Sequence, residues 1–503
     1  MDTFGTIIDT FVYLQSLLSL TVLLAITGGL AMGIAIGAIP GINGAMGVAL
    51  LIPLTFVLDA NVAIPMLASL YIGAQFGGAI PAILLNSPGT GSAAATTFDG
   101  YPMAQKGQAG KALGVALVSS AAGGLVGVTV LWLFTPQLAG LAIQFGPAQY
   151  FGLTVLALSV VTSVSSASLT RGLLATSFGL FLATIGLDQI SGDARFTFGF
   201  SDLRDRIHFV PVLIGMYAFA EVFRNAALIR DKANQDFSQA TALPSWRELG
   251  LIKWVILRSA AIGSVLGALP GAGATMASFV AYNETVRFSK HPEKMGTGQP
   301  EGVAASEAAD NSAACGAFIP LLALGIPGSA TTAIILAAFH VHGLRPGPLL
   351  FTSDVDLVNV IFLALFVGNF IMVVLGLVGA KVFSRIVQIP YSILGPAILV
   401  MGAIGSFAIR RNVLDLWVVL VFGIIGYIFD KRDIPKAPFI LAIILGPLVE
   451  ENLRRALLIN RGNFFAMASD PFTAVLLVAA LFSFLYPILS SFARRGRGQH
   501  GSR

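Results

Sequence analysis

Long apolar stretches recur along almost the whole chain and are separated by short polar segments. A helix that spans a bilayer needs about 20 apolar residues, because it rises about 1.5 Å per residue. Stretches of this kind lie near residues 17–36, 112–134, 149–168, 172–188, 209–227, 254–270, 357–380, 391–408, 414–429 and 472–492. The pattern predicts an all-α polytopic membrane protein.

Other apolar segments contain helix breakers. Residues 61–98 include no Asp, Glu, Lys or Arg, yet they contain Pro65, Pro81 and Pro88. Four short breaks of the same kind occur along the chain: "IPGING" (39–44), "NSPGTGSA" (86–93), "LPGAGA" (269–274) and "GIPGSATT" (325–332). Backbone groups freed by Pro and Gly cannot be left facing lipid, so such breaks are expected to line protein or a water-filled cavity.

The breaks fall into two similar pairs, which indicates an internal repeat. "GAIPGINGAMGVAL" (37–50) resembles "GALPGAGATMASFV" (267–280), with Pro40 and Pro270 lying 230 positions apart. "GGAIPAILLNSPGTGSA" (77–93) resembles "GAFIPLLALGIPGSATT" (316–332), with Pro88 and Pro327 lying 239 positions apart. The extra residues of the second copy fall in the charged stretch "NETVRFSKHPEKMGTGQPEGVAASEAAD", which we expect to contain a water-facing loop.

The positions of the basic residues predict how the chain is oriented. No Lys or Arg precedes Lys106, which favours an external N-terminus. The connection 224–258 and the tail "ARRGRGQHGSR" are rich in Lys or Arg, which favours the cytoplasm for both. The two copies would then have opposite orientation, and inverted-topology repeats are typical of secondary transporters.

We therefore divide the chain into four parts. Residues 1–223 form a first transmembrane repeat with a re-entrant hairpin around 81–98, and residues 224–258 form the cytoplasmic connection. The second repeat, 259–412, has its hairpin around 316–340 and is followed by the C-terminal membrane segments and basic tail, 413–503.

The breaks are the candidate substrate and ion sites. A half-helix that begins at Pro88 or Pro327 would present free N–H groups and a positive dipole end, which bind an anion without cationic side chains. Nearby carbonyl and hydroxyl oxygens suit sodium, because hard cations prefer oxygen ligands. The candidate residues are Asn86, Ser87, Pro88, Gly89, Thr90, Gly91, Gly325, Pro327, Gly328, Ser329, Thr331 and Thr332 at the hairpins, and Pro40, Gly41, Asn43, Gly44, Pro270, Gly271 and Gly273 at the other two breaks. The alternative is that these are kinks and close-packing glycines.

Several ionisable residues carry separate hypotheses. Glu307 and Asp310 lie upstream of the second hairpin, and Glu307 is either a structural partner or a coupling group for an ion or a proton. Asp99, just past the first hairpin, is expected to be solvated or to cap a helix. Glu221, Arg171 and Arg195 are candidates for structural ion pairs, and the sequence does not say which residues pair.

Composition narrows the function. The mean hydropathy is +0.84, 11% of the residues are charged, and the net charge of +5 needs no nucleic acid, because basic inner loops explain it. A single cysteine, Cys315, excludes an internal disulfide, and no cofactor is expected. "GTGSAA" lacks the GK[ST] ending that binds nucleotide phosphates, and no GxGD or GxSG protease motif is present, so we do not expect an enzyme. An ion or carboxylate channel with a broken-helix filter remains the alternative to a transporter.

The longest motifs resemble a known family. "YIGAQFGGAIPAILLNSPGTGSAAATTFDGYPMAQKGQAGKALG" (71–114) resembles the signature region of TctA, the large membrane subunit of the tripartite tricarboxylate transporters. "GALPGAGATMASFVAY", "GIPGSATTAIILAAFHVHGLRPGPLLF" and "EENLRRALLINRGN" resemble later segments of the same family. The first signature matches from Asn86 to Thr90, whereas Asn43 and Gly44 depart from the family pattern.

This resemblance implies a multi-pass permease of the bacterial inner membrane. It would work with a small membrane subunit of the TctB type and a periplasmic binding protein of the TctC type. The substrate would be citrate-like tricarboxylates or related carboxylates, taken up by symport with a cation, for which Na+ is expected and H+ is the alternative. The paired hairpins suggest an elevator-like mechanism.

Overall fold

The computed structural model describes residues 19–39, 43–164, 168–188, 190–226, 241–271, 273–386 and 391–498. The first half of the chain forms α2 (Leu20–Gly37), α3 (Gly44–Thr55), α4 (Ala60–Leu85), η1 (Ser92–Ala94), α5 (Thr97–Gln105), α6 (Ala109–Ala142), α7 (Pro147–Val164), α8 (Leu169–Ala183), β1 (Gly186–Leu187), β2 (Ala194–Arg195), η2 (Ser201–Asp205), α9 (Phe209–Leu213), η3 (Ile214–Phe219) and α10 (Ala220–Ala226). The second half forms α11 (Trp246–Ala268), α12 (Gly273–Phe288), η4 (Pro292–Lys294), α13 (Pro300–Gly316), α14 (Phe318–Leu324), α15 (Ala330–Val341), α16 (Leu350–Ser353), α17 (Val355–Ile386), α18 (Tyr391–Arg410), α19 (Val413–Lys431), α20 (Lys436–Ile459), α21 (Phe464–Ala468) and α22 (Pro471–Gly498).

Within the described ranges, seven helices are long and apolar enough to cross a membrane. They are Leu20–Gly37, Ala60–Leu85, Ala109–Ala142, Trp246–Ala268, Val355–Gly379, Ser392–Arg410 and Val413–Lys431. The expectation of an all-α polytopic membrane protein is confirmed. The segments predicted near 149–168, 172–188, 209–227 and 472–492 are helical but are not among these seven.

Helix α4 is the main difference from the predicted spans. It runs unbroken for 26 residues although Pro65 and Pro81 lie inside it, and 94% of its most apolar window is buried. Proline is tolerated inside membrane helices when neighbouring helices accommodate the freed backbone groups. No span was predicted over residues 60–85, yet the helix continues through both prolines and the break begins at Asn86.

Glycines set the close packing around α4 and α13. On α2, a methyl group added at Gly33 or Gly37 would lie 2.2 Å from the Leu70 or Ala74 carbonyl oxygen of α4. On α11, methyl groups at Gly263 and Gly267 would lie 2.4 and 2.3 Å from the carbonyl oxygens of Ala309 and Ala313 on α13. Small residues four apart allow this backbone approach, as in other membrane helix pairs.

Helix α13 is buried although its sequence is rich in polar residues. Residues 302–316 are all buried, including Glu307 and Asp310, and α13 packs against α6 and α11. The water-facing loop expected in this charged stretch is limited to the segment around η4, where His291 to Lys294 are exposed. Cys315 is also buried in α13, as a packing residue.

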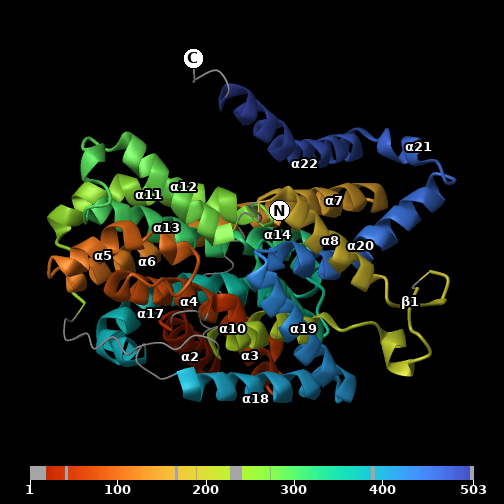
Figure 1. Cartoon of the computed structure of the whole chain (residues 1–503), viewed down its shortest axis with the longest axis horizontal. Helices are drawn as coiled ribbons and strands as arrows, with labels where there is room; N and C mark the ends of the chain where they lie inside the picture. Colours follow the sequence, from red (N-terminus) through yellow and green to blue (C-terminus); the bar gives the residue numbers. More distant parts are fainter. Residues whose placement is uncertain are drawn as a thin grey trace.

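The helices form two assemblies that Figure 1 shows on opposite sides of the molecule. Helices α5, α6, α11 and α13 lie side by side in one, and α7, α8, α20 and α22 pack together in the other. Three short elements, α9, η3 and α10, follow one another between residues 209 and 226, and the middle one, η3, is a π-helical turn.

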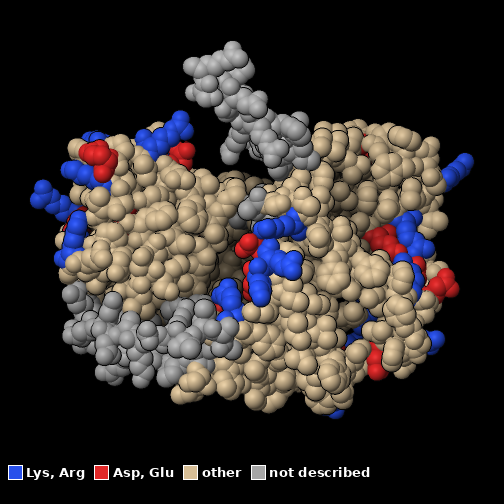
Figure 2. Space-filling model, in the orientation of Figure 1, with Lys and Arg blue, Asp and Glu red and all other residues tan. Residues whose placement is uncertain are grey.

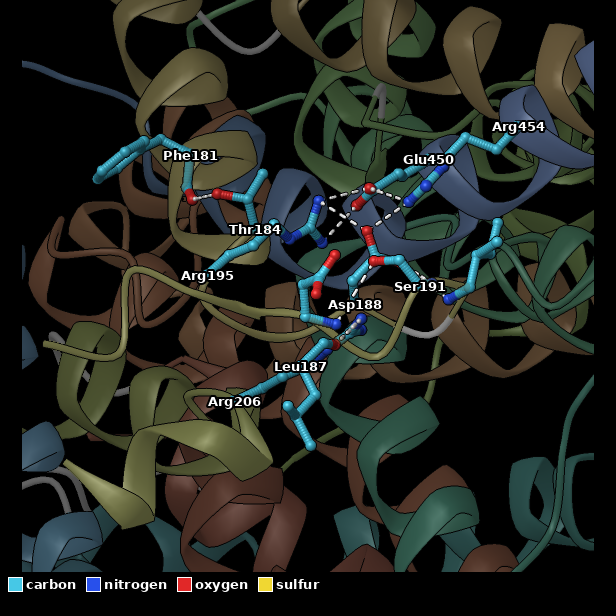
Figure 3. Close-up of polar contacts among 11 residues, drawn as sticks. Phe181, Thr184, Leu187, Asp188, Ser191, Arg195, Arg206, Glu450 and Arg454 are labelled. Carbon is cyan, nitrogen blue, oxygen red and sulfur yellow. Dashed lines mark hydrogen bonds and ion pairs between the residues drawn. The ribbon is translucent and has the colours of Figure 1, made fainter. Parts of the chain in front are cut away.

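A short hairpin formed by β1 and β2 is joined to α20 by ion pairs (Figure 3). Arg195 donates two hydrogen bonds to Glu450, of 2.6 and 3.0 Å, and Arg454 pairs with both Glu450 and Asp188. Asp188 also accepts hydrogen bonds from the backbone N–H groups of Ile190 and Ser191. These contacts, together with the pairs Arg171–Asp433 and Arg224–Glu221, answer the pairing question that the sequence left open.

Candidate functional site

The first break is a loop between α4 and η1. Helix α4 ends at Leu85, and Asn86 takes the left-handed conformation (φ 53°), which Asn adopts more readily than most residues. The N–H of Ser87 donates to the Pro81 carbonyl oxygen at 3.3 Å, and the next helical turn begins only at Ser92. The expectation of a half-helix starting at Pro88 was therefore wrong, since Pro88 lies inside the loop.

The second break has the same backbone structure as the first. Helix α14 ends at Leu324, and Gly325 takes the left-handed conformation (φ 71°). The N–H of Ile326 donates to the Pro320 carbonyl oxygen at 3.1 Å. Helix α15 begins at Ala330 rather than at Pro327, because Ser329 and Thr332 form a reciprocal capping box that fixes its start.

Each loop is held close to a neighbouring backbone by a glycine. A methyl group at Gly89 would lie 1.9 Å from the Gly37 carbonyl oxygen and 2.9 Å from the Cα of Gly78. One at Gly328 would lie 2.8 Å from the Cα of Ala317 and 2.9 Å from the Gly267 carbonyl oxygen. The N–H of Gly271 donates to the Gly328 carbonyl oxygen at 3.1 Å. Glycine is required at both places because no side chain fits.

A cavity of about 480 Å³ lies where the two loops and the other two breaks meet. Eight of the candidate residues line it: Asn43, Gly44, Thr90, Gly91, Gly271, Gly273, Ser329 and Thr331. Its further lining includes the polar side chains of Tyr71, Gln75, Ser92, Tyr217 and Thr275, which sequence reasoning missed. Ser92 lies inside the predicted break 86–93, and Gln75 gave a signal as a polar side chain in the middle of the long uncharged stretch 61–85.

The remaining candidates lie elsewhere. Pro40 and Gly41 fall outside the described residues. Asn86 and Gly325 cap the ends of α4 and α14, and Thr332 is buried in the capping box. Gly328 and Pro327 lie within the second loop, and Pro270 and Ser87 are not among the residues that line the cavity.

The polar groups of this cavity are neutral. The hydroxyls of Tyr71 and Ser329 lie 3.3 Å apart, and those of Thr90 and Ser92 lie 3.0 Å apart. In the capping box the N–H of Ser329 donates to Thr332 and the N–H of Thr332 donates to Ser329, which leaves the first-turn amides of Ala330 and Thr331. Both of these residues line the cavity, so it offers hydroxyl and N–H donors that suit a carboxylate.

A second chamber of about 490 Å³ adjoins the first and carries charge. The two chambers share Asn43, Thr90, Gly91, Tyr217 and Ala437, and Pro88 and Gly89 line the second. Its charged lining residues are Glu221, Arg224, Asp430 and Lys436.

These four residues form two ion pairs. Arg224 pairs with Glu221 at 2.6 Å, and Lys436 pairs with Asp430 at 2.7 Å. Figure 2 shows Lys, Arg, Asp and Glu side chains gathered at the rim of a hollow near the middle of the face in view. The expectation of a site without cationic side chains thus fits the first chamber but not the second.

Two acidic residues from the sequence hypotheses are fully buried behind these chambers. Asp99 accepts hydrogen bonds from Tyr282 (2.9 Å) and from the backbone N–H groups of Gly298 (2.8 Å) and Gln299 (2.7 Å), which precede α13. The capping role is the one that the contacts support, and the solvated role was wrong. Glu307 accepts hydrogen bonds from the hydroxyls of Thr96 (2.5 Å) and Ser120 (2.9 Å) and does not line either chamber.

Comparison with known proteins places the chain in a family. The model of the "Tripartite tricarboxylate transporter TctA family" matches residues 23–441. The chain belongs to the TctA family. This family is a transporter subunit rather than an enzyme family, and it implies a tripartite system with partners of the TctB and TctC types. With its apolar helices, this chain is a multi-pass membrane protein.

Two curated relatives from Agrobacterium vitis are similar to this TctA-family chain. An "uncharacterized 52.8 kDa protein in TAR-I ttuC' 3'region" is 39% identical over 466 residues, which cover 92% of both chains. An "uncharacterized protein in TAR-II ttuC' 3'region" is 40% identical over 229 residues, which cover 46% of this chain and 95% of the relative. No solved structure was found to match.

Proposed function

We propose that this chain is the permease subunit of a binding-protein-dependent secondary transporter that imports citrate-like tricarboxylates or related carboxylates. Uptake is coupled to a cation gradient, with Na+ as the expected ion. The chain works with a TctB-like membrane subunit and a TctC-like periplasmic binding protein. It lies in the bacterial inner membrane with a periplasmic N-terminus and a cytoplasmic C-terminus.

One observation carries this proposal: all four Pro-Gly breaks contribute to a single polar cavity, which is also lined by α4, a helix long and apolar enough to span a membrane. Carboxylates bind there through the hydroxyls of Thr90, Ser329 and Thr331 and the first-turn amides of α15. Such neutral donors bind an anion without a permanent countercharge, so the substrate is also released.

The charged chamber serves as the approach to this site. Lys436 and Arg224 attract the anion, and their ion-pair partners Asp430 and Glu221 keep the empty chamber neutral. Three of the four side chains are largely buried, so a substrate carboxylate that displaces Glu221 or Asp430 has to replace the hydrogen bonds of that partner. Tyr217 lies between the chambers, since it lines both.

Two inverted repeats and an elevator-like movement are part of the proposal. The matching geometry of the loops at 86–91 and 325–329, with Asn86 and Gly325 both left-handed, supports the repeat. The cavity is lined by α4, α12 and α15 and by η3 and α20, so movement of these elements relative to one another would change its access.

Uptake of a panel of labelled di- and tricarboxylates into proteoliposomes tests the proposal. The vesicles contain both membrane subunits, the cognate binding protein is outside, and an inward Na+ gradient is imposed or omitted. Accumulation that requires the gradient and the binding protein is the expected result. Downhill equilibration indifferent to both would favour the channel alternative.

A further inference from the structure

Glu307 and Asp310 are the two acids of the chain's buried helix α13 that lack a countercharge. They lie three positions apart, hence on one face, and both side chains are fully buried. No Lys, Arg or His of the described chain forms an ion pair with either one. Asp415 is equally buried, but Arg410 pairs with it at 2.5 Å.

The hydrogen bonds of the two acids differ. Both oxygens of Glu307 accept a hydroxyl donor, from Thr96 and from Ser120. Asp310 accepts a hydrogen bond on Oδ1 from the Gln75 side-chain N–H and also interacts with the Ser92 hydroxyl, whereas its Oδ2 has no geometric hydrogen-bond partner among the described residues. A buried carboxylate oxygen without a donor is costly, so Oδ2 is the atom at which a cation would be most stabilising.

A positively charged ligand would compensate the two acids. Two carboxylates in the middle of a buried helix cannot both stay ionised without compensation, and neither lies near a helix N-terminus that would supply it. Intramembrane carboxylates without a partner usually mark ion pathways. Since the hydroxyl donors partly compensate Glu307, the cation belongs at Asp310.

The neighbourhood of Asp310 also connects it to the substrate cavity. The Gln75 side chain donates to Asp310 and lies 3.4 Å from the Ser92 hydroxyl, which lies 3.0 Å from the Thr90 hydroxyl. Gln75, Ser92 and Thr90 all line the cavity. A cation at Asp310 is thus one side chain away from the substrate, and its binding changes the groups that the substrate uses.

We propose that Asp310 binds the coupling cation, Na+, through its free Oδ2, with Glu307 supplying a second negative charge one turn away. The Ser92 hydroxyl, which interacts with Asp310, supplies a further oxygen of the kind that hard cations prefer. Coupling to transport follows from the shared side chains, because linked binding events are reciprocal. The coupling of this cation to transport rests on the proposed function, whereas Na+ binding at Asp310 does not.

The test measures ²²Na+ binding to the purified full chain in nanodiscs without any carboxylate. Wild type should bind Na+ saturably, with no competition by K+. Asp310→Asn should weaken Na+ binding at least tenfold, and Glu307→Gln severalfold, because it removes the neighbouring charge. Asp188→Asn is the matched control, since it makes the same change in a buried acid of the β1–β2 hairpin, and should bind like wild type.

Size exclusion and melting curves show whether each variant is folded. If Asp310→Asn is not monodisperse, the Na+ affinity of Glu307→Gln is the test. An affinity equal to that of the wild type would then overturn the proposal. A wild-type chain that binds no Na+ would also overturn it, as would uptake that follows a proton gradient and ignores Na+.

Parallel uptake assays separate this inference from the proposed function. Loss of Na+ binding in Asp310→Asn, with no carboxylate uptake by the wild type, would support the cation site and refute the permease. If Asp310→Asn keeps Na+-driven carboxylate uptake and binds Na+ with unchanged affinity, the permease would be supported and the cation site at Asp310 refuted.

Discussion

Replacing Gly89 by alanine tests whether the first loop positions the substrate site. The new methyl group would lie 1.9 Å from the Gly37 carbonyl oxygen, where ordinary contacts begin near 3.4 Å, so the loop has to move by about 1.5 Å. Gly89 is not among the residues with positive φ, so the effect is steric and not conformational. Overpacking of this size costs about 1–3 kcal/mol, and the opposing atom is backbone rather than a flexible side chain.

The movement should displace the side chain of Thr90, the next residue, which lines both chambers. A hydroxyl displaced by that distance no longer forms a hydrogen bond with the substrate, and one such bond is worth about 1 kcal/mol. Together with misplacement of the rest of the loop, we expect KM for uptake to rise roughly tenfold.

Initial rates of carboxylate uptake, normalised to the amount of folded protein, provide the assay. Gly140→Ala and Gly28→Ala are the controls, because a methyl group at either position meets nothing within 4 Å. Wild-type kinetics in Gly89→Ala would refute the reasoning that this loop must stay close to α2.

Three further outcomes follow from other contacts. Thr331→Ala should raise KM about fivefold by loss of one cavity hydroxyl, whereas Ser87→Ala should leave it nearly unchanged; equal effects in uptake assays would mean that the cavity is not the site. Lys436→Gln should raise KM about tenfold and Asp430→Asn, which frees Lys436, should lower it; shifts in the same direction would indicate a structural pair only. The amides of Ile190 and Ser191, and then Arg454, hold the pKa of Asp188 below its usual range, so its stabilising contribution is complete above the ordinary carboxyl pKa of about 4 and is lost as pH falls through the lowered value. Asp188→Asn should therefore lower the melting temperature at neutral pH and flatten its acid-side dependence, and an unchanged profile between pH 5 and pH 2.5 would contradict this role.

The sequence predicted where the chain is broken better than what each break looks like. Pro-Gly pairs at four positions located the residues around the cavity, because freed backbone groups are tolerated only at such places. The predicted helix starts at Pro88 and Pro327 were wrong. At the second break, the start of α15 is fixed by the side chains of Ser329 and Thr332 rather than by proline. The span α4 was not predicted, because Pro65 and Pro81 lie inside it, and neighbouring helices support the helix around them.

The sequence did not predict which side chains from distant parts of the chain line the two chambers. Tyr217 lines both chambers and Lys436 lines the charged chamber, and nothing in the local sequence pattern links either residue to the Pro-Gly breaks. The burial of α13 had a signal in its alanine and glycine content, but its three acidic residues suggested exposure. Only packing against the glycines of α6 and α11 explains why this helix is buried.

The most direct test of the central claim is whether a carboxylate occupies the cavity between the two loops. The chain has a single cysteine, Cys315, and it is buried, so Thr331→Cys introduces one accessible thiol at the cavity wall. The rate of its modification by a small methanethiosulfonate reagent is measured in proteoliposomes with and without transported carboxylate, and a cysteine at Gly140 serves as the control. The account predicts slower modification at position 331, by several fold, when carboxylate is present, and no change at position 140. Equal rates at position 331, at carboxylate concentrations that saturate uptake, would contradict the assignment of this cavity as the substrate site.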